Sequence, residues 1–342
     1  MAPHIYHAER LDHFMARVNA QYYAETPFLS DFITAPEISQ VFGELLGAWA
    51  ITVWQGMGSP AKIILAEAGP GRGTLMADAL RVITRQAPAM AQALTVHLVE
   101  TSPRLRQVQA EILHPYTQPV WHKHVDDIPA GPMILLANEF LDALPVRQFI
   151  QTSTGWHEHY VANKSLELIS CAAPTLPDGR ILEPNTVVEV CEQAQHIVRD
   201  LAHRFAHSPG VALFIDYGHD TSSTGDSLQA LRHARPTHPL QAEEGEADLT
   251  THVDFTALLA VARKAEAATY GTENQGDFLQ HLGIMERTEQ LARTASPQDA
   301  AMLRSAANRL VAADKMGHLF KVMAMASPTL PTPPGFTKGP VA

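Results

Sequence analysis

Four short apolar runs that alternate with helical segments constrain the fold of this chain more than any other feature of its sequence. The runs occupy residues 62–67, 95–100, 133–137 and 211–215. Their length and continuous apolar character are typical of strands buried on both faces of a sheet. Strands that alternate with helices along a chain form a parallel, right-handed, doubly wound sheet. The sequence therefore predicts an α/β fold with a Rossmann-like sheet.

An N-terminal helical segment is expected before the first of these strands, over residues 1–60. Residues 8–24 have the pattern of an amphipathic opening helix. A second helix is predicted to begin at Thr34, because Pro36 and the acid that follows it suit the first turn of a helix.

The Rossmann-like domain is expected to span residues 61–326, with two departures from a plain sheet. Residues 146–187 hold β-forming and turn residues, which predicts an antiparallel insertion. Residues 226–255 are polar, which predicts a long loop of the kind that usually has a function.

The C-terminal part of this domain is predicted to return to helices over residues 254–312. Residues 319–326 are expected to form a last strand at the edge of the sheet. The segment that follows, residues 327–342, is rich in proline, which predicts a flexible tail.

A glycine-rich turn follows the first predicted strand and opens a helix. Gly69, Gly71 and Gly73 form a G-x-G-x-G pattern, which Glu67 precedes. Glycines at such a turn let the backbone approach a ligand closely, because no Cβ intervenes. A dinucleotide fingerprint needs glycine where Thr74 stands, which argues against a nicotinamide cofactor. We therefore expect Glu67 and the three glycines to bind a nucleoside cofactor that has no pyrophosphate.

Glu100 ends the second predicted strand, at the same edge of the sheet. A carboxylate there can accept hydrogen bonds from both hydroxyls of a ribose. The alternative is that Glu100 caps the helix that begins near Ser102. Together with the glycine turn, Glu100 favours a nucleoside site at the carboxyl ends of the strands.

Polar residues also follow the two later strands. Asn138 and Glu139 come directly after the third strand, and Asp216 ends the fourth. Such groups at the carboxyl edge of an open α/β sheet are easier to explain as pocket lining than as core. We predict that Glu139, Asp216 and Asn138 are the catalytic residues, whereas a helix cap explains the nearby Asp142 equally well.

Bulk properties exclude several kinds of partner. A net charge of −11 argues against non-specific nucleic-acid binding, and no apolar run has the length of a membrane span. Neither Cys171 nor Cys191 lies in a C-x-x-C motif, which indicates a reducing compartment and, with the polar N-terminus, predicts a cytoplasmic protein. No metal site is expected, because paired histidines such as His122 and His124 lack a third ligand at a recognisable spacing.

Several blocks of the sequence, in order, resemble the MidA-type methyltransferases, which include a mitochondrial assembly-factor arginine methyltransferase of respiratory complex I. The similar blocks are residues 31–40, 67–73, 137–145, 214–218, 245–255 and 316–322. The resemblance implies a class I methyltransferase fold and S-adenosylmethionine as the cofactor. The polar groups of the first block exceed what a core helix needs, so Thr34 and Pro36 are expected to line the cofactor or acceptor pocket.

The resemblance also implies a methyl acceptor. The mitochondrial member of the family is associated with symmetric dimethylation of an arginine in a complex I core subunit. A protein arginine in a respiratory-chain subunit, or in its bacterial counterpart, is therefore the expected substrate. A cofactor-binding assembly chaperone with little turnover and a small-molecule methyltransferase stay open as alternatives.

Overall fold

The structure is a computed structural model of the chain, and it describes residues 8–25, 34–177, 179, 183–221, 224–232, 235–241 and 245–337. The chain divides into two compact units. Unit 1 comprises Met1–Phe32, Leu141–His196 and His219–Val261, and unit 2 comprises Ile33–Phe140, Ile197–Gly218 and Ala262–Ala342. The division places the first helix with the predicted insertion, because both belong to unit 1.

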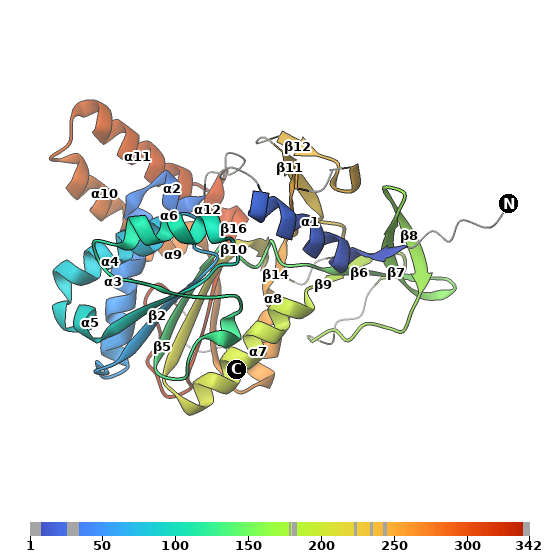
Figure 1. The fold of residues 1–342 in the computed structure, drawn as a ribbon, viewed down its shortest axis with the longest axis horizontal. Coiled ribbons are helices and arrows are strands. Elements are labelled where there is room, and N and C mark those ends of the chain that lie inside the picture. The colour runs from blue at the N-terminus through green and yellow to red at the C-terminus, as the bar shows by residue number, and fades with distance from the viewer. Residues whose placement is uncertain are drawn as a thin grey trace. The chain divides into compact units, whose positions relative to one another are not determined.

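Unit 2 is built on a mixed sheet (Figure 1). The strands in spatial order are β15 (Ala268–Asn274), β16 (Phe320–Ala326), β10 (Gly210–His219), β5 (Met133–Asn138), β2 (Ile63–Ala68), β3 (Leu94–Val99) and β4 (Val120–His122). Neighbouring strands are parallel except at β16, which is antiparallel to both β15 and β10. The four strands predicted from apolar runs are adjacent, so their carboxyl ends meet at one edge of the sheet.

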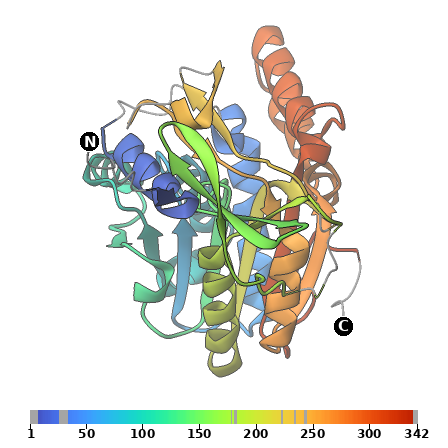
Figure 2. The same cartoon turned by 90° about the vertical axis from the view of Figure 1, so that its right-hand side faces the viewer.

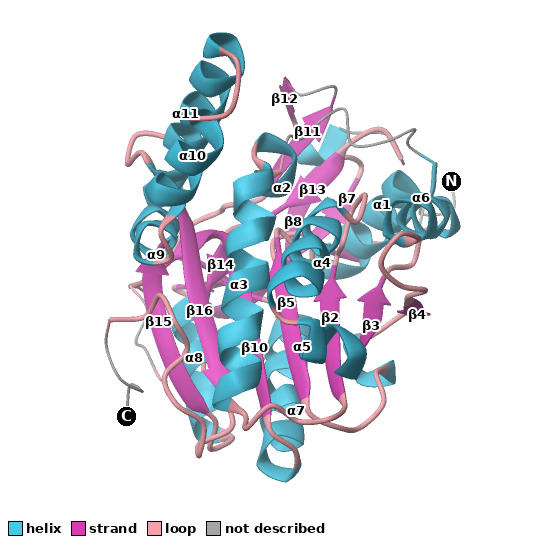
Figure 3. Ribbon diagram, turned by 90° about the vertical axis from the view of Figure 1, so that its left-hand side faces the viewer, coloured by secondary structure: helices cyan, strands magenta, loops and turns pink. Residues whose placement is uncertain are grey.

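Helices surround this sheet, and Figure 3 shows α3 and α4 in front of its strands. α3 is buried from Val41 to Trp54 over most of its circumference and contacts α4 and α10. The helices of unit 2 are α2 (Ala35–Ile38), α3 (Gln40–Gly56), α4 (Thr74–Gln86), α5 (Pro88–Ala93), α6 (Pro103–Leu113), α9 (Gln275–His281), α10 (Ile284–Ala292), α11 (Pro297–Val311) and α12 (Met316–Leu319), with the 3₁₀ turn η1 (Val125–Asp127). α7 (Glu192–His207) and α8 (Phe255–Lys264) run from one unit into the other.

Unit 1 contains the predicted antiparallel insertion, drawn in green in Figure 2. Its larger sheet consists of β1 (Glu9–Arg10), β7 (Gly155–Ala162), β6 (Arg147–Thr152) and β9 (Val187–Val190), with β8 (Ser165–Ser170) paired to β7. The opening helix is α1 (Leu11–Glu25), whose Leu11, Met15 and Val18 are fully buried.

The polar segment predicted as a long loop contains regular structure, so that prediction is wrong. It forms a small antiparallel sheet in the order β12, β11, β13. Ala230, Leu249 and Ala247 are buried in one cluster with α1 residues, and these few apolar positions stabilise strands that polar composition alone does not reveal. The elements of this segment are β11 (Gln229–Arg232), β12 (Arg235–Thr237), the 3₁₀ turn η2 (Pro239–Gln241), β13 (Asp248–Thr250) and β14 (Val253–Asp254).

The C-terminal region corrects two further predictions about the sheet. The last strand, β16, lies between β10 and β15 rather than at the edge. The segment predicted as helices contains β15, which forms that edge. The apolar run of β16 indicates burial, but burial does not specify the neighbours of a strand or its direction.

The proline-rich tail is packed against unit 2 around Phe336, which corrects the prediction of a flexible segment for residues 327–337, the part that the structure describes. Phe336 is buried, and its ring lies 5.4 Å from that of Phe278 and 6.0 Å from that of Tyr270. Trp49 Nε1 donates a hydrogen bond of 3.1 Å to the carbonyl of Pro334. One aromatic anchor and one backbone hydrogen bond thus hold a segment whose composition favours disorder.

Candidate functional site

The glycine loop, residues 69–73, joins β2 to α4 at the carboxyl edge of the sheet. Gly69 has a φ of +67° and Gly73 a φ of +85°, which side chains rarely adopt. A Cβ at Gly69 would lie 3.1 Å from the Phe140 ring, and one at Gly73 would lie 3.1 Å from Ile112. The loop therefore passes closely between Phe140, in the turn after β5, and helix α6.

Glu67 lies inside β2, just before this loop, and is 2 % exposed. Its Oε2 atom has no hydrogen-bond partner among the described residues. Burial raises the pKa of the Glu67 carboxyl to about 8, and a hydrogen bond from the Met76 backbone offsets this effect only in part. A buried carboxylate with an unused oxygen favours a cation nearby.

Glu100 follows β3 and is largely buried. Its Oε1 accepts a hydrogen bond of 2.7 Å from the amide of Ser102, and its Oε2 accepts one of 3.2 Å from Gln109. Burial raises the pKa of Glu100, and these hydrogen bonds work in the opposite direction. The carboxylate therefore holds the turn before α6, whereas the N-cap of α6 is Ser102, whose hydroxyl accepts from the amide of Leu105 at 3.4 Å. The Thr101 backbone also donates to this carboxylate, so three of its four lone-pair positions are used and one is left for a ligand hydroxyl.

Gln109, on α6, is a site residue that the sequence argument missed. It is fully buried, and its Nε2 donates to the carbonyl of Gly71 at 2.8 Å as well as to Glu100. Its Oε1 accepts a hydrogen bond of 2.8 Å from the Trp121 indole. The sequence does contain a sign of this role, because Gln109 is a polar residue on the buried face of a predicted helix, four positions from both Leu105 and Leu113.

The predicted second helix is broken at Ser39 into α2 and α3, because Ser39 is extended and its side chain accepts from the amide of Val41. α2 is attached at two points to the carboxyl edge of the sheet, where the cofactor site is predicted (the cofactor edge). The amide of Ala35 donates a hydrogen bond of 3.0 Å to Glu139 Oε1. Thr74, at the start of α4, donates through its hydroxyl to Glu37 at 2.5 Å.

The other predictions for this segment concern Thr34 and Pro36. Thr34 is half-buried at the N-cap of α2 and Pro36 is buried in its first turn. The block from which they were predicted begins at residue 31, and residues 31–33 lie outside the described part of the chain.

Glu139 follows β5 with a φ of +50°, which is costly for a residue with a Cβ. Its own amide donates to the carbonyl of Ile215 at 2.9 Å, which fixes the turn to β10. The side-chain Oε1 accepts from the backbone amide of Ala35 and, at 3.1 Å, from the side-chain Nδ2 of Asn138. The fixed backbone and the two donors orient this half-buried carboxylate, and backbone strain of this kind is common at functional sites.

Asp216 is 1 % exposed and accepts two backbone hydrogen bonds. Its Oδ2 accepts from the amide of Phe140 at 3.1 Å and its Oδ1 from the amide of Tyr217 at 3.0 Å. Asp216 thus fixes the turn that carries Glu139. Asp142 belongs to unit 1 and is also buried.

A family model matches residues 45–273, from α3 through β15, and its description is an S-adenosyl-L-methionine-dependent methyltransferase. The chain belongs to this family. The match contains the glycine loop, Glu100 and Glu139, and it confirms the resemblance found in the sequence. The protein is therefore a methyltransferase that uses S-adenosylmethionine.

The relatives of this methyltransferase include curated proteins from vertebrates. A zebrafish (Danio rerio) protein is 36% identical over 332 residues, which cover 88% of this chain and 78% of the relative. A human (Homo sapiens) protein is 35% identical over 325 residues, which cover 86% of this chain and 73% of the relative. Both are named protein arginine methyltransferase NDUFAF7, mitochondrial.

A solved structure shows the same fold. A Burkholderia thailandensis protein bound to S-adenosylhomocysteine matches with a TM-score of 0.79 at 24% sequence identity, covering 98% of this chain and 92% of that one. The predicted class, a Rossmann-like α/β methyltransferase fold with an antiparallel insertion, is confirmed.

The same comparisons correct the predicted location. The curated relatives are mitochondrial proteins by name, so the expectation of a cytoplasmic protein is wrong. Composition and two unpaired cysteines indicate a reducing environment without specifying a compartment. Among the described helices of this methyltransferase, none has the length and apolar character needed to cross a membrane.

The described residues fit the cofactor. S-adenosylmethionine carries a sulfonium and an ammonium, and a positive group beside Glu67 Oε2 would supply the interaction that this buried atom lacks. Glu100 offers an acceptor for a ribose hydroxyl at the end of the neighbouring strand.

Proposed function

We propose that this methyltransferase transfers a methyl group to an arginine of a protein. Two observations support the proposal: the names of the relatives, and the orientation of Glu139. The observation that carries most weight is Glu139, a half-buried carboxylate held by two donors at a strained backbone position of the cofactor edge.

The residues of the cofactor edge have different roles in cofactor binding. Glu100 accepts a ribose hydroxyl, Glu67 balances positive charge, and the glycine loop passes close to the cofactor. When bound, S-adenosylmethionine supplies a methyl group on a positively charged sulfur. The protein then contributes chiefly by positioning the acceptor, which can account for about 7–11 kcal/mol of a barrier.

Glu139 has the chemistry that an arginine acceptor needs. A guanidinium has a pKa above about 12, so it arrives charged and with its nitrogen lone pairs delocalised. A fixed carboxylate binds it through charged hydrogen bonds, orients one nitrogen toward the methyl group and accepts the proton that this nitrogen loses when it gains the methyl group. Asn138 and Asp216 act through Glu139, because Asn138 donates to its Oε1 and Asp216 fixes the turn that bears it.

The substrate proposed from the sequence resemblance is a respiratory complex I subunit or its bacterial counterpart. The test is to incubate the purified chain with isotopically labelled S-adenosylmethionine and with protein extract from cells that lack it. Labelled methylarginine should appear after acid hydrolysis of the protein fraction, and mass spectrometry should locate it in a respiratory-chain subunit.

The control is Glu139→Gln, which keeps an acceptor oxygen for Ala35 and removes the negative charge. It should bind S-adenosylhomocysteine normally and form little methylarginine. Label that appears only in small molecules would contradict the proposed protein substrate.

A further inference from the structure

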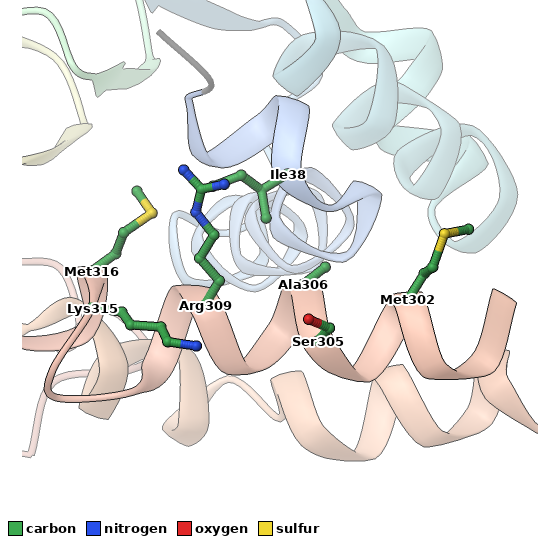
Figure 4. Close-up of a pocket in the computed structure, with 7 residues that line it drawn as sticks. All are labelled: Ile38, Met302, Ser305, Ala306, Arg309, Lys315 and Met316. Carbon is green, nitrogen blue, oxygen red and sulfur yellow. The ribbon is translucent and has the colours of Figure 1, made fainter. Parts of the chain in front are cut away.

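A groove in unit 2 lies between α2 and α11 (Figure 4). It has a volume of ≈ 620 Å³. Ile38 of α2 faces it from one side, and Met302, Ala306 and Arg309 of α11 face it from the other. Lys315 and Met316 lie toward one end.

The sequence of α11 shapes this groove. Met302, Ser305, Ala306 and Arg309 follow the spacing i, i+3, i+4, i+7, so they share one face of the helix. The two small residues in the middle form a low floor between longer side chains. This face extends over about 10 Å at 1.5 Å per residue, a length that matches about three residues of extended peptide.

The walls are apolar and adaptable. Met302 is 57% exposed although it is a large apolar side chain. Met316 and Ile38 are half-buried. Methionine has an unbranched, polarizable side chain, so it packs against apolar groups of varied shape and is common at binding surfaces that accept several sequences.

The charge of the groove is positive in a chain of net charge −11. Arg304, on the same helix, forms an ion pair of 2.6 Å with Glu289, and Arg287 forms one of 2.7 Å with Glu44. By contrast, Arg309 and Lys315 form no ion pair with any residue in the described ranges. Two cationic side chains without an ion-pair partner among the described residues, beside small and apolar side chains, complement a ligand that is both acidic and apolar.

The groove is also connected to the predicted catalytic acid. α2 has four residues and therefore a length of about 6 Å. Its first residue, Ala35, donates to Glu139, and its last residue, Ile38, lines the groove. A polypeptide bound along α11 thus reaches a helix whose other end contacts the acid that would orient an arginine.

We propose that the groove between α2 and α11 binds an acidic and apolar segment of the protein substrate, close in sequence to the arginine that is methylated. An apolar side chain of the substrate occupies the floor at Ser305 and Ala306, and its carboxylates pair with Arg309 and Lys315. This inference rests on the proposed function, because it requires a protein as the methyl acceptor.

The test uses a display library of random 12-residue peptides, selected on the full-length chain in the presence of S-adenosylhomocysteine. Enriched peptides should carry a net negative charge and at least one large apolar residue. The best peptide is then synthesised with a fluorescent label, and its binding is measured by anisotropy.

Two groove variants and one control decide the outcome. Ala306→Trp fills the floor, and the double variant Arg309→Glu, Lys315→Glu reverses the charge; each should weaken peptide binding at least tenfold. Lys62→Glu makes one such charge reversal at an exposed bend before β2 and should leave binding unchanged. All three should keep the wild-type affinity for S-adenosylhomocysteine, which shows that they are folded.

The inference is overturned if no peptide is enriched, if the enriched peptides are neutral or basic, or if the groove variants bind as well as the wild type. Peptide binding is measured without methyl transfer. A failure of the proposed function would therefore show separately, as the absence of methylarginine in the protein fraction.

Discussion

Replacing Glu67 by glutamine should change how the stability of the protein depends on pH. Burial raises the pKa of this carboxyl from 4.5 to about 8, so the folded chain keeps a proton that the unfolded chain releases. Stability from this group is therefore fully present below the unfolded pKa and is lost as pH rises through about 8. Glutamine mimics the protonated acid and does not titrate.

The expected magnitude follows from the two pKa values. A group with a pKa of about 8 in the folded chain and 4.5 in the unfolded chain removes about 3 to 4 kcal/mol of unfolding free energy between about pH 5 and pH 8. The difference between Glu67→Gln and wild type should grow by about this amount over that range. Because other groups titrate equally in both proteins, the difference isolates Glu67.

Urea unfolding, followed by circular dichroism at several pH values, measures this difference. Glu111→Gln removes an exposed carboxylate of α6 and serves as the matched control. A wild-type-minus-variant difference that stays constant within about 1 kcal/mol from pH 5 to pH 8 would refute the account of Glu67 as a buried acid without a full set of partners.

Four further predictions concern the cofactor edge. Calorimetry near pH 7 in buffers of different ionisation enthalpy should show proton release when S-adenosylmethionine binds, because positive charge beside Glu67 lowers its pKa; Glu67→Gln should show none. Glu100→Ala should weaken S-adenosylhomocysteine binding by about 1–3 kcal/mol in the same instrument, the usual scale for hydrogen bonds to a charged group, and unchanged affinity would exclude ribose binding by Glu100. Glu139→Gln should lower the rate of methyl transfer by about a hundredfold or more with unchanged cofactor affinity, and near-normal turnover would show that another carboxylate orients the acceptor. Gln109→Leu should weaken cofactor binding at least tenfold through loss of the Gly71 and Glu100 hydrogen bonds while stability measured by urea changes less, and equal losses in both would indicate a purely structural role.

The sequence by itself determined the central part of the sheet and its cofactor edge. β2, β3, β5 and β10 are continuous apolar runs, and such runs are recognisable locally because both faces of a central strand are buried. The residues directly after these strands were predicted to meet at one edge because parallel strands all end there. That argument located Glu67, Glu100, Glu139 and the glycine loop without any knowledge of side-chain contacts.

Features that depend on pairing between distant segments were not predictable in this way. β16 is apolar wherever it is placed, so only the packed sheet decides that it lies between β10 and β15 and runs in the opposite direction. The tail around Phe336 has the composition of a disordered segment, yet a site beside Tyr270 and Phe278 buries its aromatic ring. In each case packing between segments that are distant in the sequence outweighs the structure that the local sequence favours.

Within the site, the sequence determined which chemical groups are present, and the tertiary structure decided what each one contacts. Gln109 became recognisable as a site residue only when α6 brought it to both Gly71 and Glu100. Likewise, the predicted helix start at Thr34 gave no indication that α2 would connect Glu139 to a groove on α11. A hydrogen bond acts over about 3 Å, so partners more than a hundred residues apart in sequence are determined by the packing of the sheet and its helices and by nothing local to either residue.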